Sequence, residues 1–276
     1  MLQDIYPHVF CNDFVRRDPV PGDIALFFPA PDQVLLKSGE NGLTLPTFAD
    51  FSPVAAQGAD HLFDIDDQGV YLLAKPGVYS GALSACSTLQ FRTLQPGHLA
   101  FAGITASQLY RWKHSHRFCG SCGSPMRGGD WERCMVCPNC HQVEYPKISP
   151  AVITAITDGD RLLMVKNDRS SYPNWALVAG FVEFGETFEQ TVAREAREEV
   201  GLSVKDIRYI GSQPWPFSET EMVGFVAHLD GPDVITLQEE ELTDARWFAR
   251  ADIPPSTSDI SIGNRLIELF RAGELG

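Results

Sequence analysis

Gly180-Phe-Val-Glu-Phe-Gly-Glu-Thr-Phe-Glu-Gln-Thr-Val-Ala-Arg-Glu-Ala-Arg-Glu-Glu-Val-Gly-Leu202 is the stretch that decides the fold of the C-terminal half. From Thr187 to Val200 the apolar residues recur at helical spacing, and Gly201 follows directly. This pattern predicts a helix over 187–200 that Gly201 ends, since glycine is favoured just after a helix. The apolar stripe of this helix consists of Phe188, Val192, Ala196 and Val200.

The same helix carries three carboxylates. At about 100° per residue, Glu195, Glu198 and Glu199 fall within an arc of about 100°. Glu199 projects into the apolar stripe, where an uncompensated charge is costly, and like charges at this spacing repel. A divalent cation resolves both problems because hard cations take several carboxylate oxygens. Arg194 can pair with a neighbouring acid, and for any single glutamate a solvated helix face is the alternative.

This stretch resembles the Nudix box, G-x5-E-x7-R-E-U-x-E-E-x-G-U, in which U is apolar and Ala196 is a small U. The fixed positions are occupied by Gly180, Glu186, Arg194, Glu195, Glu198, Glu199, Gly201 and Leu202. The resemblance implies an αβα sandwich that hydrolyses a nucleoside diphosphate linked to a second group. It also implies catalytic Mg²⁺ or Mn²⁺ at the three glutamates, with Arg194 beside them.

The flanking sequence predicts an α+β protein with three segments. Residues 1–112 are expected to form a β-rich domain ending in a helix, residues 113–145 a zinc ribbon, and residues 146–276 the Nudix domain. Short apolar runs bounded by Gly, Pro and Asp indicate strands, and longer periodic stretches indicate helices. The expected strands are 34–36, 70–73, 151–156, 161–165, 224–229 and 245–248, and the further helices are 96–112 and 263–270.

An aromatic segment, Ser212-Gln-Pro-Trp-Pro-Phe217, follows the box. A segment rich in Pro and Trp is otherwise typical of a rigid loop or edge strand, but in this place it resembles the array of NADH pyrophosphatases. The resemblance implies that Phe181 stacks on a base and that Tyr145 and Trp215 shape the pocket, with Gln213 and Phe217 as further substrate contacts. The family continues with Pro-x-Ser-Leu-Met, whereas residues 218–222 read Ser-Glu-Thr-Glu-Met, which affects the expected dinucleotide preference.

Two further positions follow from the same resemblance. The acidic run 238–242 stands where the family supplies one more metal ligand, and alignment on Leu242 and Trp247 favours Glu241; a solvated acidic turn is the alternative. Gly263 stands where a small residue would let a base approach the backbone.

Four of the seven cysteines form two CxxC pairs, Cys119/Cys122 and Cys137/Cys140, with fourteen residues between them. Four thiolates at this spacing suit a tetrahedral zinc ion, and four protein ligands make the zinc structural. Cys134 also forms a CxxC with Cys137; the family pattern favours Cys137 with Cys140. Cys11 and Cys86 have no assigned role.

The formal net charge is −14 over 276 residues, which argues against long duplex nucleic acid as a partner. The one dense basic patch, residues 111–117, either caps a helix C-terminus or attracts phosphates or an RNA 5′ end. No membrane span or targeting segment is visible, so the cytoplasm is expected, and the cysteine usage fits a reducing compartment.

The family resemblance predicts hydrolysis of NAD(H) to NMN(H) and AMP, with removal of NAD caps from RNA as a related activity. The same residues leave an ADP-ribose or nucleoside diphosphate sugar hydrolase open. A non-catalytic ligand sensor is the alternative from another class, although such sensors typically lose box carboxylates. A homodimer is implied by resemblance alone.

Overall fold

The computed structural model describes residues 1–39, 42–166, 175–238, 240–256 and 258–275. Its chain divides into two compact units, 2–147 and 148–276, and Met1 belongs with the second. We call them the N-terminal unit and the C-terminal unit. The division of the first 145 residues into two domains stays a prediction, since the N-terminal strands and the cysteine-rich segment belong to one unit.

A six-stranded sheet forms the middle of the C-terminal unit. Its order is β14-β15-β11-β12-β16, and β13 pairs with β11. Strands β11 and β15 are parallel, whereas the other pairs are antiparallel. The strands are β11 (Ser149–Asp158), β12 (Arg161–Lys166), β13 (Val178–Phe181), β14 (Val204–Trp215), β15 (Thr220–Leu229) and β16 (Asp244–Ala249).

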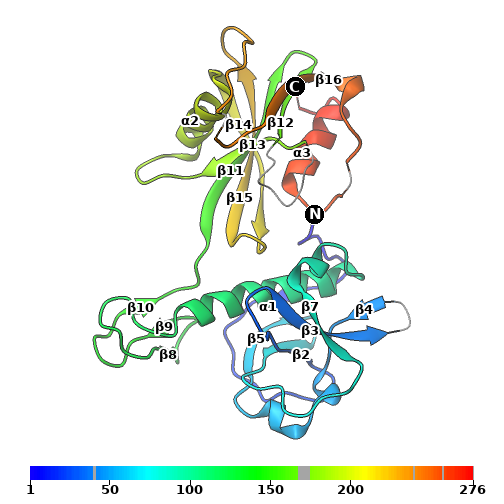
Figure 1. Ribbon diagram of the computed structural model, residues 1–276, viewed down its shortest axis with the longest axis vertical. Coiled ribbons are helices and arrows are strands. Elements are labelled where there is room, and N and C mark those ends of the chain that lie inside the picture. The colour runs from blue at the N-terminus through cyan, green and yellow to red at the C-terminus, as the bar shows by residue number, and fades with distance from the viewer. Residues whose placement is uncertain (40–41, 167–174, 239, 257, 276) are drawn as a thin grey trace. The chain divides into compact units, whose positions relative to one another are not determined.

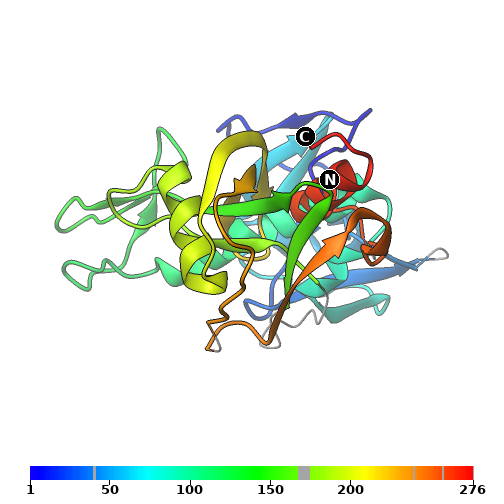
Figure 2. The ribbon, with the colours of Figure 1, turned by 90° about the horizontal axis from the view of Figure 1, so that it is seen from above.

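Helices α2 (Phe188–Val200) and α3 (Ile262–Arg271) cover opposite faces of this sheet (Figures 1 and 2). Alternation along the strands sends neighbouring side chains to the two cores. Ile156 packs with α2, for example, and Ala155 packs with α3. The result is the predicted αβα sandwich, and apolar packing holds both helices against the sheet.

The predicted elements of this unit are confirmed with boundaries shifted by a few residues. Gly159 lies in the turn between β11 and β12 and has the left-handed conformation at φ 56°. Strand β14 is the main element that the sequence did not predict, because its burial alternates weakly along an edge position.

The N-terminal unit is β-rich, as predicted. Its two small sheets have the orders β1-β5-β6-β2 and β4-β3-β7 and enclose a core that includes Ala25, Leu35 and Leu73. The strands are β1 (Phe10–Cys11), β2 (Ile24–Leu26), β3 (Gln33–Gly39), β4 (Gly42–Thr44), β5 (Asp60–Ile65), β6 (Gln68–Leu72) and β7 (Leu83–Ser87).

Helix α1 (Gly97–Ser115) follows these strands and ends three residues later than predicted. Its Gly103 lies against the ring of Phe91, where a β-carbon would come within 2.2 Å of a ring carbon. The cysteine-rich segment comes next and forms a three-stranded sheet of β8 (Arg127–Gly128), β9 (Met135–Val136) and β10 (Val143–Glu144).

No helix in the described part of the chain has the length and apolar character needed to cross a membrane.

Candidate active site and metal centre

Local sequence fixes both ends of the helix that carries the carboxylates. At the N-terminus, the hydroxyl of Thr187 accepts from the Gln190 backbone, and the Gln190 side chain accepts from the Thr187 backbone, which makes a capping box. At the C-terminus, Gly201 adopts φ 71°, a conformation that other residues rarely take. The helix therefore presents its glutamates in one fixed register.

Arg194 is the centre of the site's hydrogen bonding. Its Nε and Nη2 donate to the two carboxylate oxygens of Glu186 at 2.7 and 3.0 Å. Its Nη1 donates to Glu195 at 2.7 Å and to Glu198 at 2.9 Å. Nη2 also donates to the carbonyl of Phe181 at 2.9 Å, so each of the five N–H groups has an acceptor.

The Glu186 carboxylate holds the loop before α2 in place through hydrogen bonds. Hydrogen bonding from Arg194 lowers the pKa of Glu186 to about 2, so this side chain is ionised at neutral pH. The same carboxylate accepts from the Thr191 hydroxyl at 2.9 Å and from the Glu183 backbone N–H at 3.2 Å. Because both of its oxygens accept hydrogen bonds from the protein, Glu186 is a positioning residue for Arg194 and the loop.

Glu199 is buried as the helical pattern predicted, at 6% exposure. Burial first, and the negative charges of Glu195 and Glu241 next, raise its pKa to about 8. Its Oε2 atom is buried and has no hydrogen-bond partner among the described residues. An unpartnered carboxyl oxygen of this kind needs a cation or a proton.

Glu195 is 8% exposed and packs against Gly180 of strand β13. A β-carbon at Gly180 would lie 2.0 Å from the Glu195 carboxyl carbon, so the first glycine of the motif provides space for this carboxylate. Burial raises the pKa of Glu195, although Arg194 opposes the shift. The sequence marked Gly180 as fixed; its contact with Glu195 depends on tertiary packing.

Glu241 lies on a loop that is tied to the end of α2. The backbone N–H groups of Thr236 and Gln238 donate to the carbonyls of Val200 and Glu199 at 2.9 and 3.0 Å. The charge of Glu241 raises the pKa of both Glu195 and Glu199, which places this side chain in their electrostatic neighbourhood. Glu239 of the same acidic run lies outside the described residues.

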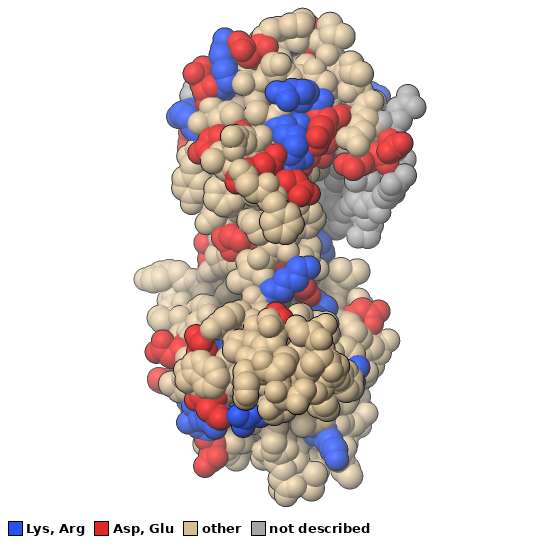
Figure 3. Space-filling model, turned by 90° about the vertical axis from the view of Figure 1, so that its left-hand side faces the viewer, with Lys and Arg blue, Asp and Glu red and all other residues tan. Residues whose placement is uncertain are grey.

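The donor set fits a divalent cation. The carboxylates are oxygen ligands, two of them are buried, and one buried oxygen lacks a partner. Among the described residues, no three of these carboxylates have oxygen atoms within 4.8 Å of one another, and Arg194 binds Glu195 and Glu198. Figure 3 shows that Lys and Arg side chains lie among Asp and Glu over the C-terminal unit, so local pairing offsets the acidic composition.

The predicted aromatic contacts divide between the two units. Phe181 ends strand β13 and is more than half exposed, so its ring is accessible for stacking. Trp215 and Phe217 lie at the end of β14, with ring centroids 5.0 Å apart. Tyr145 belongs to the N-terminal unit, where its hydroxyl donates to Glu132 at 2.8 Å.

Gln213 and Gly263, which are predicted to contact the substrate, also contact other residues of the C-terminal unit. Gln213 is fully buried; its amide donates to the Ile260 carbonyl at 2.8 Å and accepts from the Ile262 backbone N–H at 2.6 Å. It therefore joins β14 to the first turn of α3. Gly263 lies against Ile153, whose Cδ1 would be 2.9 Å from an added β-carbon. The sequence could not reveal these contacts because their partners are distant along the chain.

The unusual segment after Phe217 forms the turn between β14 and β15. The Ser218 backbone N–H donates to the Trp215 carbonyl at 3.2 Å, and Glu219 has φ 60°. Glu221 faces Pro214 across the strands, and burial raises its pKa. The residues that depart from the family pattern, 218–221, therefore lie in the turn between β14 and β15 and at the start of β15.

The four predicted zinc ligands come together in the N-terminal unit. The sulfur atoms of Cys119, Cys122, Cys137 and Cys140 all lie within 4.8 Å of one another. The Cys119–Cys140 and Cys122–Cys137 sulfur distances are both 3.5 Å. Tetrahedral zinc with bonds of about 2.3 Å requires sulfur atoms about 3.8 Å apart. The arrangement supports a structural zinc.

The two knuckles have the same backbone geometry. The Gly123 N–H donates to the Cys119 carbonyl at 2.9 Å, and the His141 N–H donates to the Cys137 carbonyl at 3.1 Å. Both donors have positive φ, 74° and 63°. Cys134 is buried against Gly129 and is not in the cluster, which resolves the ambiguity left by the two overlapping CxxC patterns.

Comparisons with known proteins agree with these two sites. Residues 147–269 match the family model described as NUDIX domain, and residues 114–145 match the model described as NADH pyrophosphatase zinc ribbon domain. Among solved structures, a NUDIX hydrolase from Nitrosomonas europaea is 28% identical, with 56% of this chain and 90% of that chain covered and a TM-score of 0.49.

Two curated relatives carry the name NAD-capped RNA hydrolase NudC. The one from Stutzerimonas stutzeri (strain A1501) is 40% identical over 223 residues, which cover 81% of this chain and 80% of the relative. The one from Pseudomonas entomophila (strain L48) is 44% identical over 171 residues. That second match covers 62% of each chain, less than two thirds of the relative's length.

The zinc assignment predicts different outcomes for two neighbouring cysteines. Cys137→Ser should lose most of its zinc, because removing one thiolate weakens a four-ligand site strongly. Cys134→Ser should keep the wild-type zinc content, because its sulfur lies outside the cluster. Elemental analysis of the purified proteins measures both. Zinc loss in Cys134→Ser with retention in Cys137→Ser would show that the ligand set is wrong.

The raised pKa of Glu199 predicts a pH-dependent stability. Its ordinary value is 4.5 and its folded value is about 8, so between these values the folded state holds a proton that the unfolded state has released. Stability therefore falls as pH rises through this window. Without Mg²⁺ or Mn²⁺, Glu199→Gln should unfold at a higher temperature than wild type at pH 8, and the difference should shrink toward pH 5.

Thermal unfolding of zinc-loaded protein measures this difference. Glu198→Gln is the matched control, since this glutamate is on the same helix and its side chain is 52% exposed. A stabilisation by Glu199→Gln that is constant from pH 5 to pH 8 would contradict the account.

Proposed function

Because the chain belongs to the NudC family of NAD-capped RNA hydrolases within the Nudix superfamily, we propose that it hydrolyses the pyrophosphate bond of NAD(H). Water adds across the P–O–P linkage, and the products are NMN(H) and AMP. We propose the removal of NAD caps from RNA 5′ ends as a second use of the same site. The observation that carries the proposal is the buried carboxyl of Glu199, whose Oε2 atom has no hydrogen-bond partner among the described residues, in a complete carboxylate constellation.

Residues of α2 and of the following loop would hold the catalytic cation. The proposed ligands are Glu195, Glu198, Glu199 and Glu241. A bound Mg²⁺ or Mn²⁺ neutralises pyrophosphate oxygens and lowers the pKa of a bound water. Arg194 orients Glu195 and Glu198, and Glu186 holds Arg194 in place.

Proton transfer needs one carboxylate that can accept a proton from the attacking water. Glu199 and Glu195 are the buried candidates, and their pKa values are both raised. A raised pKa brings a carboxylate closer to the working pH, which suits a general base. The same two residues are also proposed ligands, so the base is whichever carboxylate is free of the cation.

Recognition of the substrate rests on exposed aromatic rings. Phe181 is attached to the catalytic loop through its carbonyl, which accepts from Arg194, so a base stacked on its ring would lie next to the carboxylates. Stacking of this kind contributes about 1–3 kcal/mol per base in nucleic-acid complexes. Trp215 and Phe217 are proposed as further walls of the pocket, and the contribution of Tyr145 stays a prediction from the family resemblance. Gln213 and Gly263 would act indirectly, by holding β14 and α3 in place.

We propose a homodimer with one structural zinc per subunit, on the basis of the family resemblance. The cytoplasm is the proposed location, supported by thiolate zinc ligands, which suit a reducing compartment. Size-exclusion chromatography with light scattering tests the dimer directly.

Hydrolysis assays test the proposed function. Wild type should cut NADH or NAD⁺ to a mononucleotide and AMP in the presence of Mg²⁺ or Mn²⁺. Glu199→Gln should lower kcat by about two orders of magnitude or more, since it removes a charged group from the reacting site. Glu189→Gln is the control, because this exposed glutamate lies on α2 outside the constellation.

Parallel assays with ADP-ribose and NAD-capped RNA distinguish the substrates. A preference for ADP-ribose would mean that the altered turn at 218–221 has moved the specificity. A protein that binds these ligands but cuts none of them would contradict the enzymatic proposal and favour a ligand sensor.

A further inference from the structure

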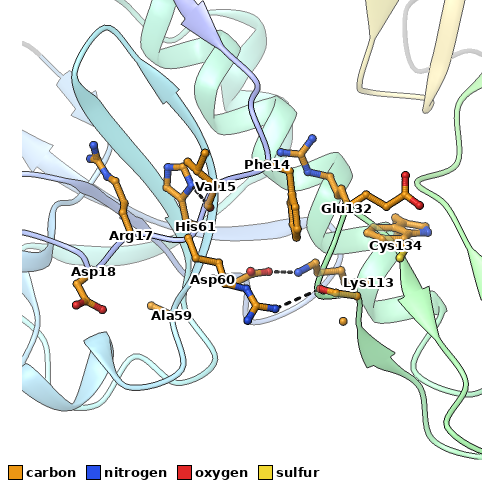
Figure 4. Close-up of a pocket in the computed structure, with 15 residues that line it drawn as sticks. Phe14, Val15, Arg17, Asp18, Ala59, Asp60, His61, Lys113, Glu132 and Cys134 are labelled. Atoms are coloured by element: carbon orange, nitrogen blue, oxygen red, sulfur yellow. Dashed lines mark hydrogen bonds and ion pairs between the residues drawn. The ribbon is translucent and has the colours of Figure 1, made fainter.

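A cleft of about 420 Å³ lies within the N-terminal unit. Four parts of this unit line it: residues 14–18, the start of β5, the end of α1, and residues 128–134 of the cysteine-rich segment. Figure 4 shows Phe14 close to Lys113 in the middle of the lining residues, and Val15 beside His61. Neither the carboxylates of α2 nor the zinc ligands contribute to it.

One lining residue is a buried donor without an acceptor. Trp112 is 1% exposed, and its indole Nε1 has no hydrogen-bond partner among the described residues. Indole is a donor only, so a protein acceptor or a ligand oxygen is the group that satisfies it. A buried donor left unpaired is costly, which makes this position informative.

Two of the cations that line the cleft, Arg133 and Lys113, have few neutralising contacts. Arg133 donates to the Leu62 carbonyl and has no carboxylate partner in the described part of the chain. Lys113 forms an ion pair with Asp60, drawn as a dashed line in Figure 4. Burial and the charge of Arg133 nevertheless lower the pKa of Lys113 to about 8, and burial lowers the pKa of Arg133.

The lining of the cleft has four Lys and Arg side chains and three Asp and Glu side chains. Asp60 is paired with Lys113, and Glu132 accepts hydrogen bonds from Trp131 at 2.7 Å and Tyr145 at 2.8 Å. Asp18 is exposed. Arg16, another lining cation, is held only by exposed Asp130 and by the Gly129 carbonyl.

We propose that this cleft binds the phosphate group of a small phosphate monoester, of the mononucleotide class. The guanidinium of Arg133 can bind phosphate oxygens through two N–H groups, and the indole N–H of Trp112 supplies a neutral donor. The exposed ring of Phe14 offers an apolar surface for the rest of the molecule. The proposed site lies in the N-terminal unit, and none of the carboxylates of α2 lines it.

A small molecule is favoured over a nucleic-acid chain by the charge distribution. Binding to a polynucleotide needs a series of cations along the backbone. Here the lining cations converge on one cleft, and the chain as a whole carries a net charge of −14.

Calorimetric titration of AMP and of inorganic phosphate into the zinc-loaded full chain tests the proposal. Mg²⁺ and Mn²⁺ are left out so that the C-terminal unit has no cation to hold phosphate. Arg133→Gln should weaken AMP binding about tenfold or more, as expected for loss of a charge-assisted contact. Trp112→Phe should weaken it severalfold while keeping an aromatic ring. Arg127→Gln, an exposed cation of the same segment outside the cleft, should stay within about twofold of wild type.

Each outcome decides the question. Absence of AMP binding, or equal affinity in wild type and both cleft variants, overturns the proposal. Loss of binding in Glu199→Gln with retention in the cleft variants would place AMP in the C-terminal unit and also overturn it. A 5′-phosphorylated RNA oligonucleotide that binds tenfold tighter than AMP would show that the ligand is an RNA end. If Arg133→Gln loses its circular dichroism or its zinc, Trp112→Phe alone gives the answer.

Discussion

The hydrogen bonding of Arg194 is the constraint on which the catalytic region depends. Its five N–H groups reach two oxygens of Glu186, one each of Glu195 and Glu198, and the Phe181 carbonyl. One planar group thereby fixes the loop, the helix and strand β13 relative to one another. Lysine has one nitrogen with three donors and cannot reproduce this fork. As a consequence, the carboxylates of Glu195 and Glu198 are paired with the Arg194 guanidinium.

Glu199 stands apart from this arrangement. It is the buried carboxyl that Arg194 does not contact, and its Oε2 atom has no partner among the described residues. The helix therefore combines a set of acids whose charge is satisfied by the protein with one acid whose charge is not. This difference is the physical reason for assigning Glu199 the central role in cation binding, and it would not follow from counting acidic residues.

Much of this region could be predicted from the sequence because its determinants are local. The caps at Thr187 and Gly201 and the burial of Glu199 follow from residues within a few turns of one helix. The role of Gln213 was not predictable, since its partners Ile260 and Ile262 are nearly fifty residues away. The exclusion of Cys134 from the zinc cluster likewise needed the tertiary structure.

In the N-terminal unit, too, features that depend on neighbouring residues could be predicted from the sequence, and features that depend on distant residues could not. Its β-rich character could be predicted from short apolar runs, whereas its cleft could not, because the lining residues come from four separate parts of the chain. The basic patch at 111–117 was predicted either to cap a helix or to attract phosphates. His116 and Arg117 contact carbonyls at the end of α1, which supports the capping alternative. Lys113 lines the cleft, and the attraction of phosphates by this patch stays a prediction.

The most direct test of the central claim is the number of protons released when Mn²⁺ binds at pH 7. With a pKa of about 8 in the metal-free state, Glu199 is mostly protonated at this pH and must ionise to become a ligand. Calorimetry of zinc-loaded protein in two buffers with different ionisation enthalpies measures that release. The account predicts close to one proton per chain for wild type and almost none for Glu199→Gln. Mn²⁺ binding without proton release in wild type would contradict it.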